Sequence, residues 1–195
     1  MPAVGKTAVQ QYRSVTAGVR PSALLGGEMF LNQADNVMTV PDVANVPKDV
    51  ALDTTMVLTA DYTNATTTIS TVHTFQGVAN AVYEVEWLAI WQASATTLGL
   101  KLSLSTPAGA IQSMLALISS VQNGVTSPTF LELGTSATAQ SGPVAAVAAV
   151  PTIAQARGLI VMGTTAGAIV LGAAATTTGT VTIKAGSSLK YRRIR

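Results

Sequence analysis

The sequence has 195 residues, a formal net charge of +2 and no cysteine. The lack of cysteine excludes a disulfide framework, a thiolate nucleophile and a cysteine-ligated zinc site, and the small net charge argues against a general nucleic-acid surface. Only 10% of the residues are charged, whereas 48% are hydrophobic. We therefore expect copies of the chain, or a larger assembly, to cover part of its surface.

Residues 1–54 are predicted to form an extended attachment arm. Their apolar side chains are scattered, so this stretch buries little surface alone and should lie along a partner or a neighbouring subunit. Residues 29–31 and 37–40 predict the strands of a small hairpin. The turn falls at residues 33–36, because Asp and Asn tolerate positive φ. Residues 42–53 predict a linker.

Several positions between residues 18 and 40 form a pattern of small, polar and apolar residues. They are Gly18, Pro21, Ser22, Leu24, Gly27, Glu28, Asn32, Ala34, Asp35 and Val40. The pattern resembles the N-terminal segment of many tail-fibre and related virion proteins of tailed bacteriophages, which attaches a fibre to the virion. The resemblance implies virion attachment through Arg20, Pro21, Leu24, Glu28, Phe30, Asn32 and Asp35. The chain departs from that family in having only a short continuation, residues 43–50, in place of a long shaft.

Residues 55–195 predict an all-β domain with a jelly-roll-like β-sandwich fold. Predicted strands lie at residues 56–59, 71–75, 82–92, 100–104, 130–133, 159–162, 168–171, 180–185 and 188–194. Short strands at this spacing, with no long helical pattern, indicate a sandwich. Residues 110–118 and 144–150 fit either a helix or a strand, and Asn123-Gly124 marks a turn.

The stretch 82–105 carries the clearest pattern and both tryptophans of the chain. Its alternating apolar residues are Tyr83, Val85, Trp87, Ala89 and Trp91, and Leu88 and Ile90 make the opposite face apolar as well. This pattern predicts a central strand buried on both sides. Leu100, Leu102 and Leu104 resume the alternation after a short polar break, which predicts a β-hairpin.

Residues 158–175 carry no charge and are about as long as the shortest membrane-spanning helices, roughly 18 residues. Gly-Thr-Thr-Ala-Gly at their centre has the composition of a turn. The segment therefore predicts a hairpin of two buried strands, at 159–162 and 168–171, with no membrane span.

Glu84 and Glu86 are two residues apart on a strand, so both carboxylates point to one face. Such a pair could act as the acid and base of a glycosidase, or bind calcium together with Asp61. No third polar cluster accompanies the pair, and Lys101 on the next strand is the expected ion-pair partner. A solvated strand face is therefore the preferred interpretation.

Other candidate sites are weaker, and we expect neither a catalytic set, a metal site nor a cofactor. His73 is the only histidine and is predicted to lie at the surface or in an interface. The sequence Asn64-Ala65-Thr66 matches a glycosylation acceptor, which we interpret as accidental.

The basic C-terminus predicts a final strand with two distinct faces. Leu189, Tyr191 and Arg193 share one face. Charges of this kind suit an edge strand, so a terminal strand or subunit interface at Tyr191, Arg192, Arg193 and Ile194 is preferred to a nucleic-acid contact. The second half of the chain is also similar to a C-terminal β-domain of phage virion proteins, through Gly186, Ser187, Leu189 and Ile194.

The sequence thus predicts a non-enzymatic structural protein of a phage virion, assembled in the host cytoplasm. A tail fibre or tail-attached protein is the first hypothesis, a capsid decoration protein the second and a carbohydrate-binding receptor module the third. Expected partners are further copies of the chain, most simply in a homotrimer, other tail or capsid proteins, and a host-surface glycan for the third hypothesis.

Overall fold

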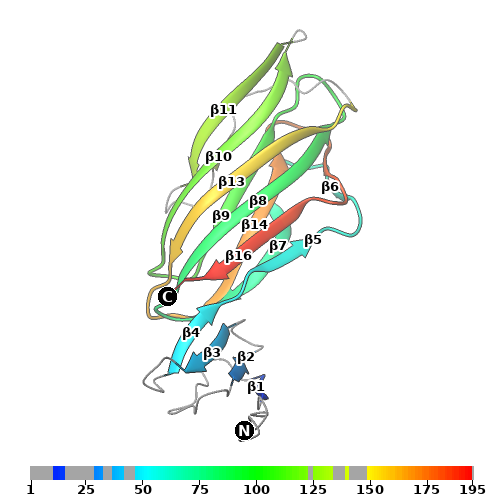
Figure 1. Ribbon diagram of the computed structural model, residues 1–195. Helices are drawn as coiled ribbons and strands as arrows, with labels where there is room; N and C mark the ends of the chain where they lie inside the picture. The colour runs from blue at the N-terminus through cyan, green and yellow to red at the C-terminus, as the bar shows by residue number, and fades with distance from the viewer. Residues whose placement is uncertain are drawn as a thin grey trace, which may run out of the picture. The chain divides into compact units, whose positions relative to one another are not determined.

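The computed structural model describes residues 11–15, 29–32, 37–41, 47–122, 125–133, 139–140 and 149–194. These residues form sixteen strands and no helix (Figure 1), which confirms the all-β prediction. By its internal contacts the chain divides into two units, Met1–Thr54 with Arg192–Arg195, and Thr55–Tyr191. In the described part of the chain, no helix has the length and hydropathy that a transmembrane span requires.

The N-terminal unit contains a four-stranded sheet. Its strands, in sheet order, are β1 (Gln11–Ser14), β2 (Met29–Asn32), β3 (Val37–Pro41) and β4 (Pro47–Ala51). The pairing of β2 with antiparallel β3 confirms the predicted hairpin, whose turn at residues 33–36 lies outside the described residues. The prediction of a linker over residues 42–53 is wrong in part, because β4 pairs with β3 along its whole length.

The second unit is a sandwich of two sheets. The larger sheet has the order β11-β10-β13-β8-β15-β6, with β16 paired to both β8 and β5. Its strands are β5 (Thr54–Val57), β6 (Tyr62–Asn64), β8 (Val82–Ala93), β10 (Ile111–Gln122), β11 (Val125–Leu133), β13 (Thr152–Val161), β15 (Val181–Ile183) and β16 (Ser188–Arg193). The smaller sheet has the order β12-β9-β14-β7, formed by β12 (Ala139–Gln140), β9 (Leu100–Ser105), β14 (Gly167–Ala175) and β7 (Ser70–Gly77).

Strand β8 lies inside the larger sheet, as the sequence predicts. It pairs with β13 along one side, and with β15 and β16 on the other. Its inward side chains are all buried: Tyr83, Val85, Trp87, Ala89, Trp91 and Ala93. The expectation that its second face is equally buried is wrong, because Leu88 is exposed and Ile90 only half-buried.

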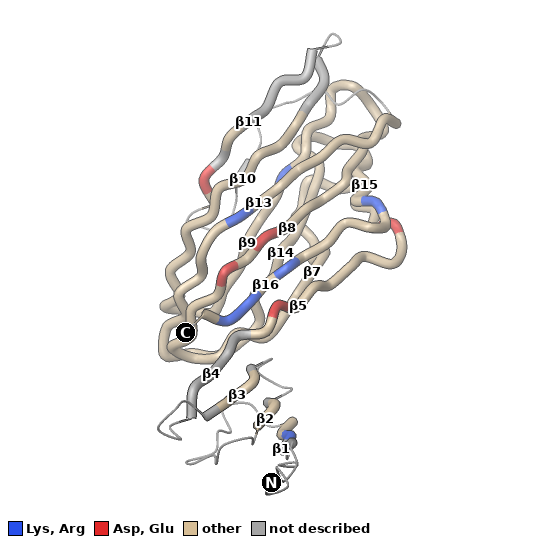
Figure 2. Tube along the Cα trace, in the orientation of Figure 1, with Lys and Arg blue, Asp and Glu red and all other residues tan. Residues whose placement is uncertain are grey.

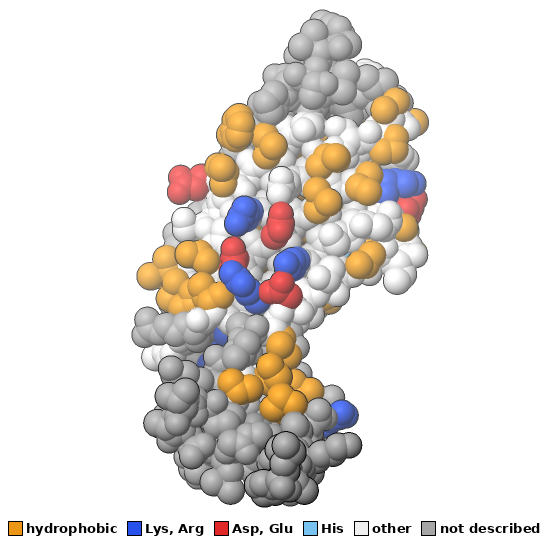
Figure 3. All heavy atoms as spheres, viewed as in Figure 1, with side chains coloured by type: hydrophobic (Ala, Val, Ile, Leu, Met, Phe, Trp, Pro, Cys, Tyr) orange, Lys and Arg blue, Asp and Glu red, His pale blue; other side chains and the backbone are white. Residues whose placement is uncertain are grey.

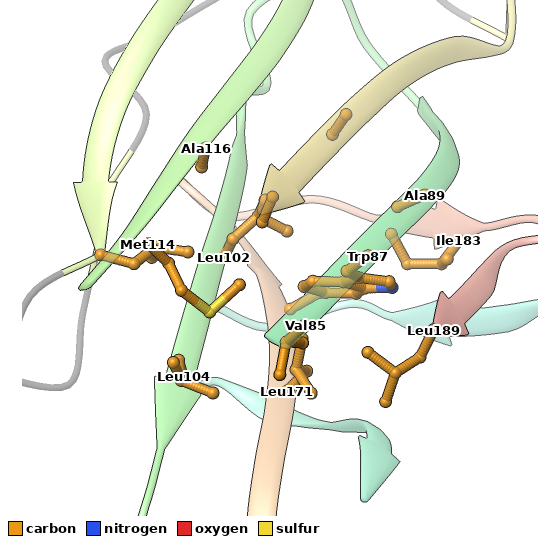
Figure 4. Close-up of a cluster of buried hydrophobic side chains, with 14 of the residues drawn as sticks. Val85, Trp87, Ala89, Leu102, Leu104, Met114, Ala116, Leu171, Ile183 and Leu189 are labelled. Carbon is orange, nitrogen blue, oxygen red and sulfur yellow. The ribbon is translucent and has the colours of Figure 1, made fainter. Parts of the chain in front are cut away.

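The core fills the space between the two sheets. Figure 4 shows Trp87 of β8 in one cluster with Leu102 of β9, Leu171 of β14 and Leu189 of β16. Burial of large side chains from four strands of both sheets supplies the main stabilisation, at roughly 1.5–3 kcal/mol for each large aliphatic or aromatic side chain.

Two predicted hairpins are wrong, because their strands belong to opposite sheets. Strand β9 follows β8 in the chain but pairs with β14 and β12, and β14 follows β13 but pairs with β7 and β9. Each of these strands has a full apolar face. When the two strands lie in different sheets, their apolar faces pack against each other and both are buried. If the strands paired edge to edge in one sheet, both apolar faces would point to the same side and would remain exposed until another layer packed on them.

The segment left open between helix and strand at residues 110–118 is a strand, β10. It forms a hairpin with β11 in which Gln122 pairs with Val125. The turn that the sequence predicts falls at Asn123 and Gly124. Those two residues, and residues 144–148 of the second ambiguous segment, lie outside the described part of the chain.

Candidate assembly surface

The outer face of the larger sheet carries most of the exposed large apolar side chains among the described residues. Along β13, Ile153, Arg157 and Leu159 point away from the core, while Ala154, Ala156 and Ile160 are buried. Val57 of β5 is one large apolar side chain of this sheet that is exposed, at 54%. Seven others, each exposed by at least 40%, are Leu88, Ile111, Leu115, Phe130, Ile153, Leu159 and Val161. They come from β8, β10, β11 and β13, so the exposed apolar residues span four adjacent strands.

Strand register arranges these residues in rows across the sheet. At one end Ile111 of β10 pairs with Val161 of β13, which pairs with Val82 of β8. At the other end Ile153 pairs with Ile90. The outer face is therefore apolar toward both ends of the β8–β13 pair, as Figure 3 shows.

A charged row crosses the middle of the same face. Arg157 of β13 pairs in register with Glu86 of β8, and its Nη2 lies 3.6 Å from Oε1 of Glu84. Gln155 donates a hydrogen bond from Nε2 to Oε1 of Glu86, at 2.9 Å. Lys190 of β16 adds an exposed positive charge, and Figure 2 shows the two signs side by side on neighbouring strands. We call Glu84, Glu86, Arg157 and Lys190 the charged row.

This arrangement corrects the ion pair that the sequence suggests for the two glutamates. Lys101 lies on β9 in the opposite sheet, where its Nζ donates to the carbonyl oxygen of Thr67 at 3.4 Å. The actual partners, Gln155 and Arg157, come from a strand about seventy residues away in sequence. The predicted hairpin between β8 and β9 is the source of the error.

The alternative of a calcium site formed by Glu84, Glu86 and Asp61 does not match the structure. Asp61 is engaged elsewhere: its carboxylate accepts hydrogen bonds from Nζ of Lys184 and from the amide of Ala185. The hydrogen bond from Lys184, followed by that from Ala185, lowers the pKa of Asp61. Among the described residues, no group of three or more His, Cys, Asp and Glu side chains could hold a metal ion.

His73 lies in the core, which corrects its predicted position at the surface or in an interface. It is 5% exposed on β7, and its ring meets that of Trp87 edge to face, with centroids 6.3 Å apart. Burial lowers the pKa of the imidazole. His73 is therefore a neutral core residue in the folded protein near neutral pH.

Asn64, the apparent glycosylation acceptor, organises a turn. Its Oδ1 accepts hydrogen bonds from the amide and the hydroxyl of Thr66, and its Nδ2 lies 2.9 Å from the carbonyl oxygen of Ala173 in the opposite sheet. The side chain is 6% exposed. The Asn-x-Thr spacing here is that of an Asx-turn, in which the side chain caps the backbone two residues on.

The C-terminal residues form an internal strand. Strand β16 lies between β5 and β8, so the edge-strand argument for its charges is wrong. Leu189 is fully buried and Tyr191 stacks on Phe75, with ring centroids 3.9 Å apart. Arg192 and Arg193 complete the strand, and Ile194 follows it with 48% exposure.

The resemblance-based attachment residues are only partly described. Phe30 and Asn32 lie in β2, where Phe30 is buried. Arg20, Pro21, Leu24, Glu28 and Asp35 lie outside the described residues.

Sequence reasoning missed the contribution of β13 and β10 to this face. The signal was present, because Ile153, Gln155, Arg157, Leu159 and Val161 alternate strictly with the small or apolar residues that turn inward. The expected strand began only at residue 159, so Arg157 was left outside it.

No protein-family model matches the sequence, and no curated protein sequence matches it. Among solved structures, one of infectious bursal disease virus, Gt strain, matches 82% of this chain at 10% identity and a TM-score of 0.29. The VP2 subviral particle of infectious bursal disease virus matches 80% of it at 11% identity and a TM-score of 0.28. The chain covers 44% and 45% of those two chains, less than half of their length.

Proposed function

We propose that this chain is a structural subunit of a tailed-bacteriophage particle, with the β-sandwich as a packing module. The observation that carries the structural role is the outer face of the larger sheet, where a complete sandwich still exposes large apolar side chains from four strands. Monomeric proteins rarely expose continuous apolar patches above a few hundred Å², and larger ones mark interaction sites. The phage context is supported by the resemblance carried by residues 18–40.

Attachment through the N-terminal unit is the first form of this proposal. Strands β2 and β3 fall inside the segment that resembles phage attachment segments, and they form part of a sheet of their own. In this form the protein is a tail fibre or a tail-attached protein, and the sandwich is the variable module that follows the attachment segment. The homotrimer remains a prediction for the assembled particle.

A capsid decoration protein is the second form, and one observation favours it. Strand β4 of the N-terminal sheet ends at Ala51, and β5 of the sandwich begins at Thr54. Too few residues lie between these two strands to form a fibrous shaft. An N-terminal sheet followed directly by a sandwich suits a clamp between neighbouring subunits of a shell.

Copy number per particle, measured by quantitative mass spectrometry of purified virions, tests both forms. A number comparable with that of the major capsid protein is expected for a decoration protein. A few copies, in multiples that match the tail symmetry, are expected for a tail protein. Absence from purified particles would overturn the proposed function in both forms.

A further inference from the structure

We propose that the outer face of the larger sheet binds the same face of a second copy of this chain. The two copies would be related by a two-fold axis that runs parallel to β8 and β13 and between them. This inference deepens the proposed function, because it names the partner that the outer face of the larger sheet binds. It rests on the proposed function only in assigning that contact to a virion.

Charge is the first argument for a second copy as the occupant. The charged row holds both signs, with Glu84 and Glu86 on β8 and Arg157 on β13. A surface of mixed sign is complementary to itself, whereas a surface of one sign repels its copy. Nucleic acid is disfavoured as an occupant, because the face also carries the exposed carboxylate of Glu132 beside Leu115.

Register is the second argument, because it fixes what a two-fold rotation brings together. Rotation about an axis between β8 and β13 places each residue of β13 over the β8 residue with which it pairs. Arg157 then lies over Glu86 of the second copy. The interface contains this charge contact twice, once on each side of the axis.

The ends of the strand pair are the third argument. The same rotation places Ile153 over Ile90, and Val161 over Val82, of the second copy. Ile153 is 52% exposed and Val161 40% exposed in the single chain, so both would lose contact with water. The positions next to the central charges bring Gln155 of one copy over Leu88 of the other, and Leu159 over Glu84. At these positions a polar side chain packs against an aliphatic one. Apolar contact at both ends and paired charges at the centre make a self-complementary face.

Two charge-reversal variants test the contact between copies. Arg157→Glu alone places like charges over each other at both symmetric contacts, and so does Glu86→Arg alone. We expect each variant of the full chain to associate at least about tenfold more weakly than the unchanged protein in analytical ultracentrifugation. An equimolar mixture should recover the original association, because both contacts of a mixed dimer again join opposite charges.

The mixture separates contact between copies from pairing within one chain. Recovery in the mixture supports the two-fold contact. Recovery only when both changes are in one chain would show that Arg157 and Glu86 act within the chain, and would overturn the proposal. Lys101→Glu, on the opposite sheet, is the matched control and should leave association unchanged. Ile153→Asp should also weaken association, because it places a charge in an apolar contact, and neither charge-reversal variant should restore it. Circular dichroism checks that each variant is folded.

The outcome is independent of the proposed function. An unchanged protein that sediments as a monomer overturns the two-fold contact even if purified particles contain the chain. A chain that dimerises as described but is absent from particles overturns the virion role and leaves the contact intact.

Discussion

The side chain of Ser187 accepts a hydrogen bond from β8 at the break between β15 and β16. Both strands lie along the same side of β8, and at the break between them the amide of Ile90 donates to the Ser187 hydroxyl at 2.9 Å. The amide of Lys184 donates to the carbonyl oxygen of Ile90 at 2.7 Å. The side chain thus continues the hydrogen bonding of β8 where no backbone acceptor is available. Gly186, with φ of 90°, makes the tight turn that allows it.

Replacement of Ser187 by Ala should therefore destabilise the fold. The Ile90 amide would lose its acceptor next to a fully buried residue, which costs about 1–3 kcal/mol. Urea denaturation measures the free energy of unfolding. Ser188→Ala, on the half-buried neighbour, should change it by less than about 0.5 kcal/mol. Equal effects of the two changes would contradict the role of Ser187.

His73 should make stability depend on pH in a narrow window. Burial lowers its pKa below the ordinary value of 6.5, so the unfolded chain binds a proton that the folded chain does not. The free energy of unfolding then rises with pH: this contribution is complete above about pH 6.5 and is lost as the pH falls toward the folded-state pKa. His73→Gln should flatten the dependence just below about pH 6.5, measured by urea denaturation. Carboxylates titrate mainly below this window, and an unchanged slope would mean that another group is responsible.

At the scale of elements, Gly158 sets the distance between β13 and β10. A Cβ at this position would lie 2.1 Å from the carbonyl oxygen of Ser113 and 2.6 Å from Cα of Met114, both backbone atoms of β10. The two strands can pair as they do only because residue 158 has no side chain. This close approach also positions Leu115 beside Arg157 on the assembly surface.

Gly158→Ala should accordingly displace β10 and destabilise the protein, by about 1–3 kcal/mol if the cost is that of an overpacked core. Hydrogen exchange should accelerate in β10 more than in β8, because the backbone atoms that the new Cβ would meet belong to β10. Gly167→Ala is the control, because its Cβ would meet only the side chain of Pro107, at 3.0 Å. Comparable losses in the two variants would show that the close approach is not the cause.

Strands were predictable from the sequence where alternation is strict, as in residues 82–93 and 188–193. Their partners were not, because alternation determines which side chains share a face and says nothing about which strand lies alongside. The wrong partner for β8 led directly to the wrong ion pair, with Lys101 in place of Arg157. The prediction for His73 was wrong for a related reason. It followed from the polarity of histidine, whereas His73 and Phe75 lie on the face of β7 that is turned to the core.

At the scale of the whole molecule, the candidate site exists only once the sheet is assembled. Arg157 and Glu86 are separated by seventy-one residues in sequence and become neighbours through β8–β13 pairing. Composition predicts assembly, because only 10% of the residues are charged, and this stays a prediction. The face proposed for assembly could be located only from the register across β10, β13 and β8.

The layer changes at residues 94–99 and 162–166 have a consequence for how the chain reaches its fold. Successive strands enter opposite sheets, so neither layer can be completed from one continuous piece of sequence. Contacts such as Asn64 with Ala173, and Asp61 with Lys184, close loops of more than a hundred residues. Loop closure on this scale must precede most of the stabilising contacts, so the sandwich should fold slowly, in about milliseconds to seconds or longer. A newly made chain would expose its strand edges during that interval, when other copies are also present.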